Sequence, residues 1–297
     1  MYKKNFNIKY FNPKNTDSGI IIFSKKKSQL LKINKNEVTK LFNKHGFIIF
    51  KGFDASPEKF LKFSKKFTTI YANDAARRTS FFSNKIKNVD EGKCEMPLHS
   101  EASYSPSWPE IVWFYCSIPP KKSGWTTICD GEKVYKKMTT QTKKFFLANP
   151  INYYMSIPFE KTNSKMKKKK LKEWFIDYPG VDDCYLDTNN KKINLKLSRY
   201  AVVKTKKKNL SFSNHLQIFL DRDPQLLKWI INKKNKLPKK IYLEIKKICK
   251  NETQNIKWKK NDFCMIDNHR YMHGRRKILS SDENRKIYNI QTLKSNF

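Results

Sequence analysis

The spacing of hydrophobic residues predicts that the chain opens with strands and then a helix. Residues 1–35 hold short apolar stretches between polar residues and are expected to form strands and loops. Residues 36–45 have the period of an amphipathic helix, and Gly46 follows as a stop signal that accepts the left-handed conformation. The apolar run Phe47–Phe50 has the length of a buried strand. The apolar face of the helix consists of Val38, Leu41 and Phe42.

A second amphipathic helix is predicted just beyond this strand. Ser56 is a residue type that caps helix N-termini, and Pro57 suits the first helical position because an N–H there would have no intrahelical partner. The inner face of this helix would consist of Phe60, Phe63 and Phe67. The opening of the chain is therefore predicted as a strand and loop region, a helix, a buried strand and a second helix.

The middle of the chain is predicted as strands, a helix and a long irregular insertion. Residues 96–135 are expected to contain strands, and Ile111–Ser117 is an almost continuous apolar run of the kind that is buried on both faces of a sheet. Val134–Leu147 has a helical pattern. Residues 150–200 are rich in turn-forming residues, and we expect a helix there only at Lys165–Trp174.

The last third of the chain is predicted to contain both strands and helices. Asp223–Lys233 and Pro238–Lys250 have helical patterns. The strands therefore fall into two groups without regular strand–helix–strand alternation, which is typical of a jelly roll or a mixed α+β fold and leaves both open. Strands are expected at Tyr200–Lys204, Leu210–Phe212, Phe263–Asp267 and Ile287–Leu293.

The composition is strongly basic. The 297 residues carry a net charge of +37, from 63 basic and 26 acidic side chains. Such a charge suits a nucleic acid or an acidic partner, because cations neutralise phosphates and steer charged molecules. However, the lysine runs fall in expected loops and helix flanks, and no zinc-finger or RNA-binding aromatic motif accompanies them. We therefore favour a solvated basic surface over a nucleic-acid partner, with an acidic carrier protein left open.

The cysteines and the apolar runs indicate a cytoplasmic protein. The six cysteines show no CxxC pair and no zinc-like spacing, so reduced and mostly buried thiols are expected. No apolar run approaches the roughly 18 residues of a membrane-spanning helix, and the basic start is followed by no apolar signal region. Aromatic residues make up 14% of the chain, which argues against disorder.

The segment Met96–Tyr104 carries the first candidate chemistry. If it is extended, His99 and Glu101 point to the same face and can both bind one metal ion. A third ligand would complete the arrangement of two histidines and one carboxylate that holds non-haem Fe(II) and leaves positions open. A histidine and a glutamate at this spacing also occur in ordinary surface strands that bind no metal. The remaining candidates for the third ligand are His45, His215, His269 and His273.

Two further motifs, taken with this segment, identify a family. Gly124–Asp130 reads GWTTICD, Asn261–Arg276 reads NDFCMIDNHRYMHGRR, and Arg285 lies twelve residues after His273. From about Leu41 to the C-terminus, the set resembles the TauD/TfdA-like (taurine dioxygenase) family of Fe(II)/2-oxoglutarate oxygenases. Within that family it resembles the clavaminate-synthase-like and syringomycin-type hydroxylase branch.

This resemblance implies a mainly β fold with flanking helices, built on a double-stranded β-helix, which is a jelly roll of the cupin type. We expect one catalytic domain, 1–297, whose β-helix core covers about 96–135 and 195–295. A helical and loop insertion would cover about 136–194.

The resemblance also implies a metal site. The family pattern G-D-x-x-x-x-D-N-x-x-x-x-H-G-R matches with Asn261 in place of the first glycine, which makes His273 the ligand and His269 a variable position. His99, Glu101 and His273 are thus the expected iron ligands and catalytic residues. The branch also uses glutamate at the carboxylate position. Related halogenases have a small residue there, so Glu101 favours oxygen transfer.

The 2-oxoglutarate site is expected at two residues. Arg285 has the position of the family arginine that binds the distal carboxylate, which suits a guanidinium because it can make two parallel charge-assisted bonds. Thr127 matches the threonine of the family's G-G-x-T motif, with Gly124 as its first glycine and Trp125 in place of the second. Arg275 and Arg276 are alternative anchors.

The substrate is expected to be small and similar to an amino acid, either free or tethered to a carrier protein. Candidate substrate residues are Tyr104, Asn214, Arg77 and Arg78. The expected reaction is hydroxylation of an unactivated C–H bond by O₂, with decarboxylation of 2-oxoglutarate to succinate; desaturation and epoxidation stay open, as does an oligomeric state. Two other function classes remain, a basic nucleic-acid-binding protein and a non-catalytic barrel scaffold.

Overall fold

The computed structural model describes residues 6–25, 29–72, 80, 82–89, 92–158, 181–187, 189–221, 227–231 and 237–297. Its largest sheet has the strand order β1-β2-β3-β16-β7-β18-β4, with β5 paired to β18. Strands β2 and β3 pair in parallel, whereas β16 pairs antiparallel with both β3 and β7. The strands are β1 (Phe6–Asn12), β2 (Asn15–Ser24), β3 (Phe47–Lys51), β4 (Thr68–Tyr71), β5 (Lys87–Asn88), β7 (Ile111–Ile118), β16 (Phe263–Asp267) and β18 (Lys286–Ser295).

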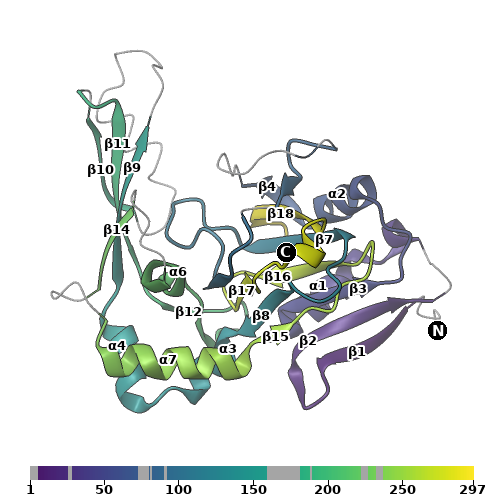
Figure 1. The fold of residues 1–297 in the computed structure, drawn as a ribbon, viewed down its shortest axis with the longest axis horizontal. Helices are drawn as coiled ribbons and strands as arrows, with labels where there is room; N and C mark the ends of the chain where they lie inside the picture. Colours follow the sequence, from purple (N-terminus) through teal and green to yellow (C-terminus); the bar gives the residue numbers. More distant parts are fainter. Residues whose placement is uncertain are drawn as a thin grey trace.

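A smaller antiparallel sheet packs against one face of the large one. Its order is β15-β8-β17-β6, and a buried apolar cluster joins the two sheets through Phe114 and Ile287 on one side and Ile128 and Tyr271 on the other. Two facing sheets of this kind form the mainly β jelly roll that the motifs predicted (Figure 1). The strands are β6 (Met96–His99), β8 (Thr126–Asp130), β15 (Gln254–Asn255) and β17 (Tyr271–Arg275).

Helices α1 (Lys35–His45) and α2 (Pro57–Lys65) cover the other face of the large sheet, and both helices were predicted from the opening pattern. Gly46 ends α1 with φ 67°, and the Ser56 hydroxyl accepts a hydrogen bond from the Lys59 N–H at the start of α2. Both caps agree with the sequence. Short 3₁₀ helices occur at Leu30–Lys32 (η1) and Ser280–Asp282 (η2).

Helices α3 (Gly131–Lys137), α4 (Thr140–Ala148) and α7 (Lys239–Glu252) lie beyond the small sheet. The single helix predicted at 134–147 is divided into α3 and α4, because Met138 is extended and the Thr139 hydroxyl caps α4 by accepting from the Thr142 N–H. Both helices and α7 belong to one apolar cluster with the outer face of the sheet. The predicted helix at 238–250 corresponds to α7.

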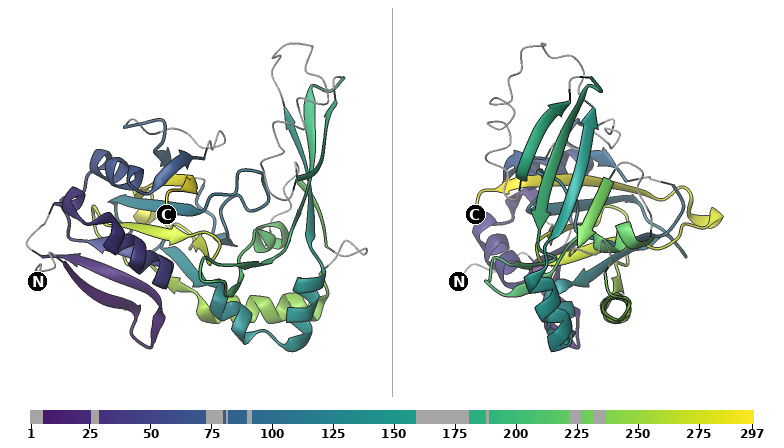
Figure 2. Two further views of the ribbon diagram at one scale, coloured as in Figure 1. Left: turned by 180° about the vertical axis from the view of Figure 1, so that it is seen from behind. Right: turned by 90° about the vertical axis from the view of Figure 1, so that its left-hand side faces the viewer.

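A third sheet extends away from the jelly roll as an arm (Figures 1 and 2). The expectation of a turn-rich stretch at 150–200 was wrong where the structure describes it, because three of the four strands of this sheet lie there. The helix predicted at 223–233 was also wrong, since 227–231 is a strand. The order is β10-β11-β9-β14, with β9 (Ile151–Pro158), β10 (Val181–Asp187), β11 (Lys192–Arg199) and β14 (Leu227–Ile231).

Cross-strand packing explains the arm. On β11 the buried residues alternate as Ile193, Leu195 and Leu197, and on β14 Trp229 pairs with Tyr153 of β9. The paired strands are distant in sequence, so the local spacing of apolar residues did not reveal them. The predicted helix at 165–174 lies outside the described residues. Strands β12 (Val202–Lys204) and β13 (Leu210–Phe212) and helix α6 (Leu216–Asp221) connect the arm to the jelly roll.

Within the described ranges, no helix combines the length and the apolar character needed to cross a membrane.

Candidate active site

Two neighbouring strands of the small sheet bring His99 and His273 together. His273 lies in the middle of β17 and pairs in register with His99, the last residue of β6. Paired residues of antiparallel strands point to the same face, and the two rings lie 4.4 Å apart between centroids. Both side chains are buried and face the interior of the jelly roll, where Phe114 of the large sheet packs 5.1 Å from His273.

Glu101 reaches the two histidines from a turn. Strand β6 ends at His99, and Ser100 to Ser103 form turns in which Ala102 has a φ of 50°. The sequence had suggested a continuous strand through Glu101, whereas the backbone bends after His99. The Glu101 Oε2 atom nevertheless lies 3.6 Å from Nε2 of His273.

The three predicted metal ligands therefore converge. One potential ligand atom each from His99, Glu101 and His273 lies within 4.8 Å of the others, and all three residues are buried. Two imidazole nitrogens and one carboxylate oxygen are the donor set typical of non-haem Fe(II) sites that keep open positions. The residues present fit Fe(II).

Asn268 holds the turn that carries Glu101. Its side chain accepts a hydrogen bond from the Glu101 N–H at 2.8 Å and donates to the carbonyls of Glu101 and Pro109 at 2.9 and 2.8 Å. Asn268 is completely buried, so these bonds are shielded from water. The Asn268 side chain therefore fixes the turn that carries the candidate carboxylate ligand.

The surroundings of His99 suit a metal ligand. Its Nδ1 lies 2.9 Å from the Pro97 carbonyl oxygen, which favours a proton on Nδ1 and leaves Nε2 for a metal. Burial, together with the neighbouring His273 and His215, lowers the pKa of His99 well below its ordinary value. The neutral imidazole is the form that binds metals.

Arg285 lies buried immediately before β18. Burial, followed by the charge of Arg275, lowers the pKa of Arg285 to about 10. Its Nε atom has no hydrogen-bond partner among the described residues, and no described carboxylate forms an ion pair with it. Gly124 leaves room for the guanidinium: it has a φ of 65°, and a Cβ there would lie 2.9 Å from Arg285 Cδ. A buried cation of this kind favours an anionic ligand.

The two alternative arginines have other contacts. Nη2 of Arg275 donates to the carbonyls of Gly92 and Cys94 at 2.9 and 2.8 Å. Arg276 forms an exposed ion pair with Glu95 at 3.0 Å. The geometry therefore favours Arg285 as the anchor for an anion inside the jelly roll.

Thr127 lies on the opposite face of the small sheet from the histidines. In the register of β8 and β17, Ile128 is opposite His273, Thr127 is opposite Gly274, and Thr126 is opposite Arg275. Side chains alternate along a strand, so Thr126 shares the interior face with His273. Its hydroxyl accepts a hydrogen bond from Trp258 Nε1 at 2.9 Å, which leaves its own proton to donate.

Thr126, which shares the interior face with His273, was not among the residues predicted from the sequence. The signal was present in the same motif, because Ser123-Gly124-Trp125-Thr126 also matches G-G-x-T, with serine in place of the first glycine. Thr126, Ile128 and Asp130 are alternate residues of β8 and share one face, and Ile128 is opposite His273. The register of the motif that ends at Thr126 therefore points toward the histidines.

The proposed substrate residues differ in their placement. The Tyr104 ring packs 4.6 Å from His215, whose ring lies 5.0 Å from His99, so Tyr104 is one ring removed from the metal ligands. The amide of Asn214 donates to the Ala201 carbonyl and accepts from the Leu216 N–H, so it supports the start of α6. Arg77 and Arg78 lie outside the described residues.

The other histidines are not part of the group whose ligand atoms converge. His269 packs 4.5 Å from Trp108, and His45 is buried at the end of α1. His215 contacts His99 but is not one of the three residues whose ligand atoms converge. Its position beside His99 had no sequence signal other than its residue type.

Comparisons with known proteins identify the family. Residues 18–291 match the family described as taurine catabolism dioxygenase TauD, TfdA family. The chain belongs to this TauD/TfdA family of dioxygenases. A clavaminate synthase-like protein of Arabidopsis thaliana is 28% identical over 123 residues, which are 40% of this chain and 37% of that relative. The match thus spans little more than a third of the curated relative's length.

Solved structures share the whole fold. PvcB from Pseudomonas aeruginosa has a TM-score of 0.65 at 11% identity, covering 98% of this chain and 92% of its own. A taurine dioxygenase from Burkholderia xenovorans has a TM-score of 0.63 at 12% identity, covering 97% and 89%. PvcB is an Fe, alpha-ketoglutarate-dependent oxygenase from an isonitrile synthetic pathway. AAD-2, with a TM-score of 0.60 at 15% identity and coverage of 97% and 96%, was solved with Mn(II) and N-oxalylglycine.

Proposed function

We propose that the protein is an Fe(II)/2-oxoglutarate-dependent oxygenase whose iron is held by His99, Glu101 and His273. The observation that carries this proposal is the convergence of their ligand atoms within 4.8 Å in a buried site of a TauD/TfdA-family chain. When bound, Fe(II) and 2-oxoglutarate supply the activation of O₂, with decarboxylation of the co-substrate to succinate. The chain's own residues bind, orient and shield the reactants.

Arg285 is the proposed anchor for the distal carboxylate of 2-oxoglutarate. Its buried guanidinium has an unsatisfied donor and no described anionic partner, so a carboxylate there gains charge-assisted hydrogen bonds. The Thr126 hydroxyl, on the interior face of β8, is proposed to donate to the same carboxylate in place of Thr127. The apolar residues around His273, including Phe114 and Ile128, exclude water from the site.

Hydroxylation of an unactivated C–H bond is the proposed outcome. Glu101 keeps the carboxylate position of the donor set, so that position is not free for a halide.

The proposed substrate is a small molecule similar to an amino acid, either free or tethered to an acidic carrier protein. The net charge of +37 supports an acidic partner, because opposite charges steer association. All six cysteines are free thiols and five are buried, which supports a reducing, cytoplasmic location.

Succinate formation tests the proposed activity. The protein, loaded with Fe(II) and 2-oxoglutarate in air, is given the free L-amino acids one at a time, and succinate is measured with and without each. We expect at least one amino acid to stimulate succinate formation and to gain one oxygen atom by mass. Substrate-stimulated turnover should disappear in Glu101→Ala. If no amino acid changes succinate formation although the basal decarboxylation is present, a free L-amino acid is not the substrate, while the oxygenase assignment stands.

A further inference from the structure

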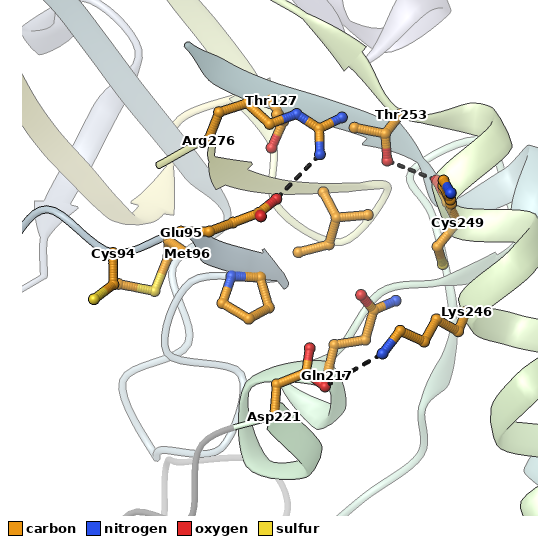
Figure 3. Close-up of a pocket in the computed structure, with 13 residues that line it drawn as sticks. Cys94, Glu95, Met96, Thr127, Gln217, Asp221, Lys246, Cys249, Thr253 and Arg276 are labelled. Atoms are coloured by element: carbon orange, nitrogen blue, oxygen red, sulfur yellow. Dashed lines mark hydrogen bonds and ion pairs between the residues drawn. The ribbon is translucent and has the colours of Figure 1, made fainter. Parts of the chain in front are cut away.

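A cavity lies behind the small sheet, away from the candidate iron site. Its volume is about 480 Å³, and β6, β8, α6 and α7 contribute its walls (Figure 3). This volume falls within the range of sites that bind small molecules. We propose that this cavity binds a small organic acid, with its carboxylate at Lys250 and Gln217 and its apolar body on β6.

The strand register separates this cavity from the iron site. Thr127 lines the cavity and is opposite Gly274, whereas the neighbouring pair, Ile128 and His273, points to the interior of the jelly roll. A Cβ on Gly274 would lie 2.9 Å from Thr127 Oγ1, which places both on the same outer side. Leu98 on β6 also lines the cavity, while the next residue, His99, faces the iron site. The sheet itself therefore divides the two sites.

The cavity contains donors without protein partners. The Nε2 atom of Gln217 is buried and has no hydrogen-bond partner among the described residues, and its side chain lies between β6 and α7 in Figure 3. An unsatisfied buried amide costs about 1–3 kcal/mol, and a rotation of the Gln217 side chain toward the cavity would let a ligand acceptor relieve this cost. Lys250 is exposed at the cavity wall and forms no ion pair within the described part of the chain.

The acidic residues of the cavity are already paired. Asp221 lies 3.8 Å from the Lys246 ammonium, and Glu95 lies 3.0 Å from the Arg276 guanidinium. These two ion pairs stand on opposite sides of the cavity in Figure 3. Each ion pair is neutral by itself, so the positive charge of Lys250 remains without a counter-charge in the cavity wall and favours an anion.

The remaining lining defines the rest of the ligand. Met96 and Leu98 present apolar side chains along β6, and Cys249 adds a buried thiol from α7. An apolar surface beside a cation and an amide donor suits a carboxylate on a short hydrocarbon body better than an inorganic anion.

Cys94 provides a direct measure of occupancy. It lines the cavity and is the one exposed cysteine of the six. In the metal-free protein without 2-oxoglutarate, the rate of Cys94 alkylation by iodoacetamide is measured by mass spectrometry, with hexanoate, hexanamide or inorganic phosphate present. We expect hexanoate to slow alkylation in a saturable way, and hexanamide and phosphate to have no such effect at the same concentrations.

Variants decide where hexanoate binds. Lys250→Glu should raise the half-protecting concentration by about 10-fold or more, because it removes a charge-assisted hydrogen bond. Lys247→Glu is the matched control, since Lys247 is an exposed neighbour on α7 outside the cavity lining and should leave protection unchanged. Arg285→Met should also leave it unchanged. The proposal would be overturned if hexanoate gave no protection, or if phosphate or hexanamide protected Cys94 equally well. It would also be overturned if Lys247→Glu weakened protection as much as Lys250→Glu, or if Arg285→Met weakened it.

Discussion

Replacement of Asn268 tests how the fold positions the carboxylate ligand. Its side chain makes three buried hydrogen bonds, two of them to the backbone of Glu101 and one to the Pro109 carbonyl. Asn268→Ala removes all three and leaves an N–H and two carbonyls without these partners. The turn that carries Glu101 would then lose the contacts that fix it opposite His99 and His273.

The magnitude follows from these bonds. At about 1 kcal/mol net for each hydrogen bond, the variant should lose about 3 kcal/mol of unfolding free energy. For a chain of this size, about 2–4 °C per kcal/mol gives a fall in Tm of roughly 6–12 °C. Loss of a contact that orients a ligand typically weakens metal binding by about 10–100-fold. We expect this loss for Mn(II), a redox-inert substitute for Fe(II), measured from the electron paramagnetic resonance signal of the free ion.

A matched control separates stability from metal binding. Asn149→Ala removes one hydrogen bond, to the Phe145 carbonyl after α4, far from the ligands in the sequence and on another layer of the fold. It should lower Tm slightly and leave Mn(II) affinity unchanged. If Asn268→Ala lost stability as expected but bound Mn(II) like the unaltered protein, Asn268 would not position Glu101.

Further predictions concern the co-substrate site and pH. Thr126→Val should weaken 2-oxoglutarate binding, measured by calorimetry, by about 10-fold or more. Thr126→Ser should recover the affinity, and Thr127→Val should leave it unchanged. Weaker binding in Thr127→Val but not in Thr126→Val would assign the role to Thr127. Gly124→Ala should cost about 1–3 kcal/mol in thermal unfolding, because of its positive φ, and should weaken 2-oxoglutarate binding through its clash with Arg285. Burial, with Lys44 and other cations, lowers the pKa of His45 from 6.5 to about 4. The unfolded chain therefore takes up this proton first, and stability should fall as pH drops from 6.5 to 4. The fall in unfolding free energy between pH 6.5 and 4 should be smaller in His45→Gln. An identical fall would contradict the assignment of this pH dependence to His45.

The jelly roll and the residues of the candidate metal site were predictable because their signals are local. Short motifs carried His99, Glu101, His273 and Arg285, and apolar runs marked the central strands such as β7. Helix caps at Gly46 and Ser56 follow from the preferences of single residues, so α1 and α2 were also predictable.

The remaining features depend on contacts between distant residues. The arm forms because β11 and β14 both pair with β9, which a linear pattern does not encode. The turn at Glu101 depends on Asn268, more than 160 residues away. The side of the sheet that each threonine faces follows from the register of β8 and β17, so the motif alone did not show that Thr126, and not Thr127, shares the interior face with His273.

Anaerobic titration of the metal-free protein with Fe(II) and 2-oxoglutarate tests the central claim most directly. Chelation of Fe(II) by the 2-oxo acid group gives a weak visible charge-transfer band. We predict that the band appears in the unaltered protein, is lost in His99→Ala, and requires a higher 2-oxoglutarate concentration in Arg285→Ala. A folded protein that gives no band at saturating Fe(II) and 2-oxoglutarate would contradict the assignment of His99, Glu101 and His273 as an iron site.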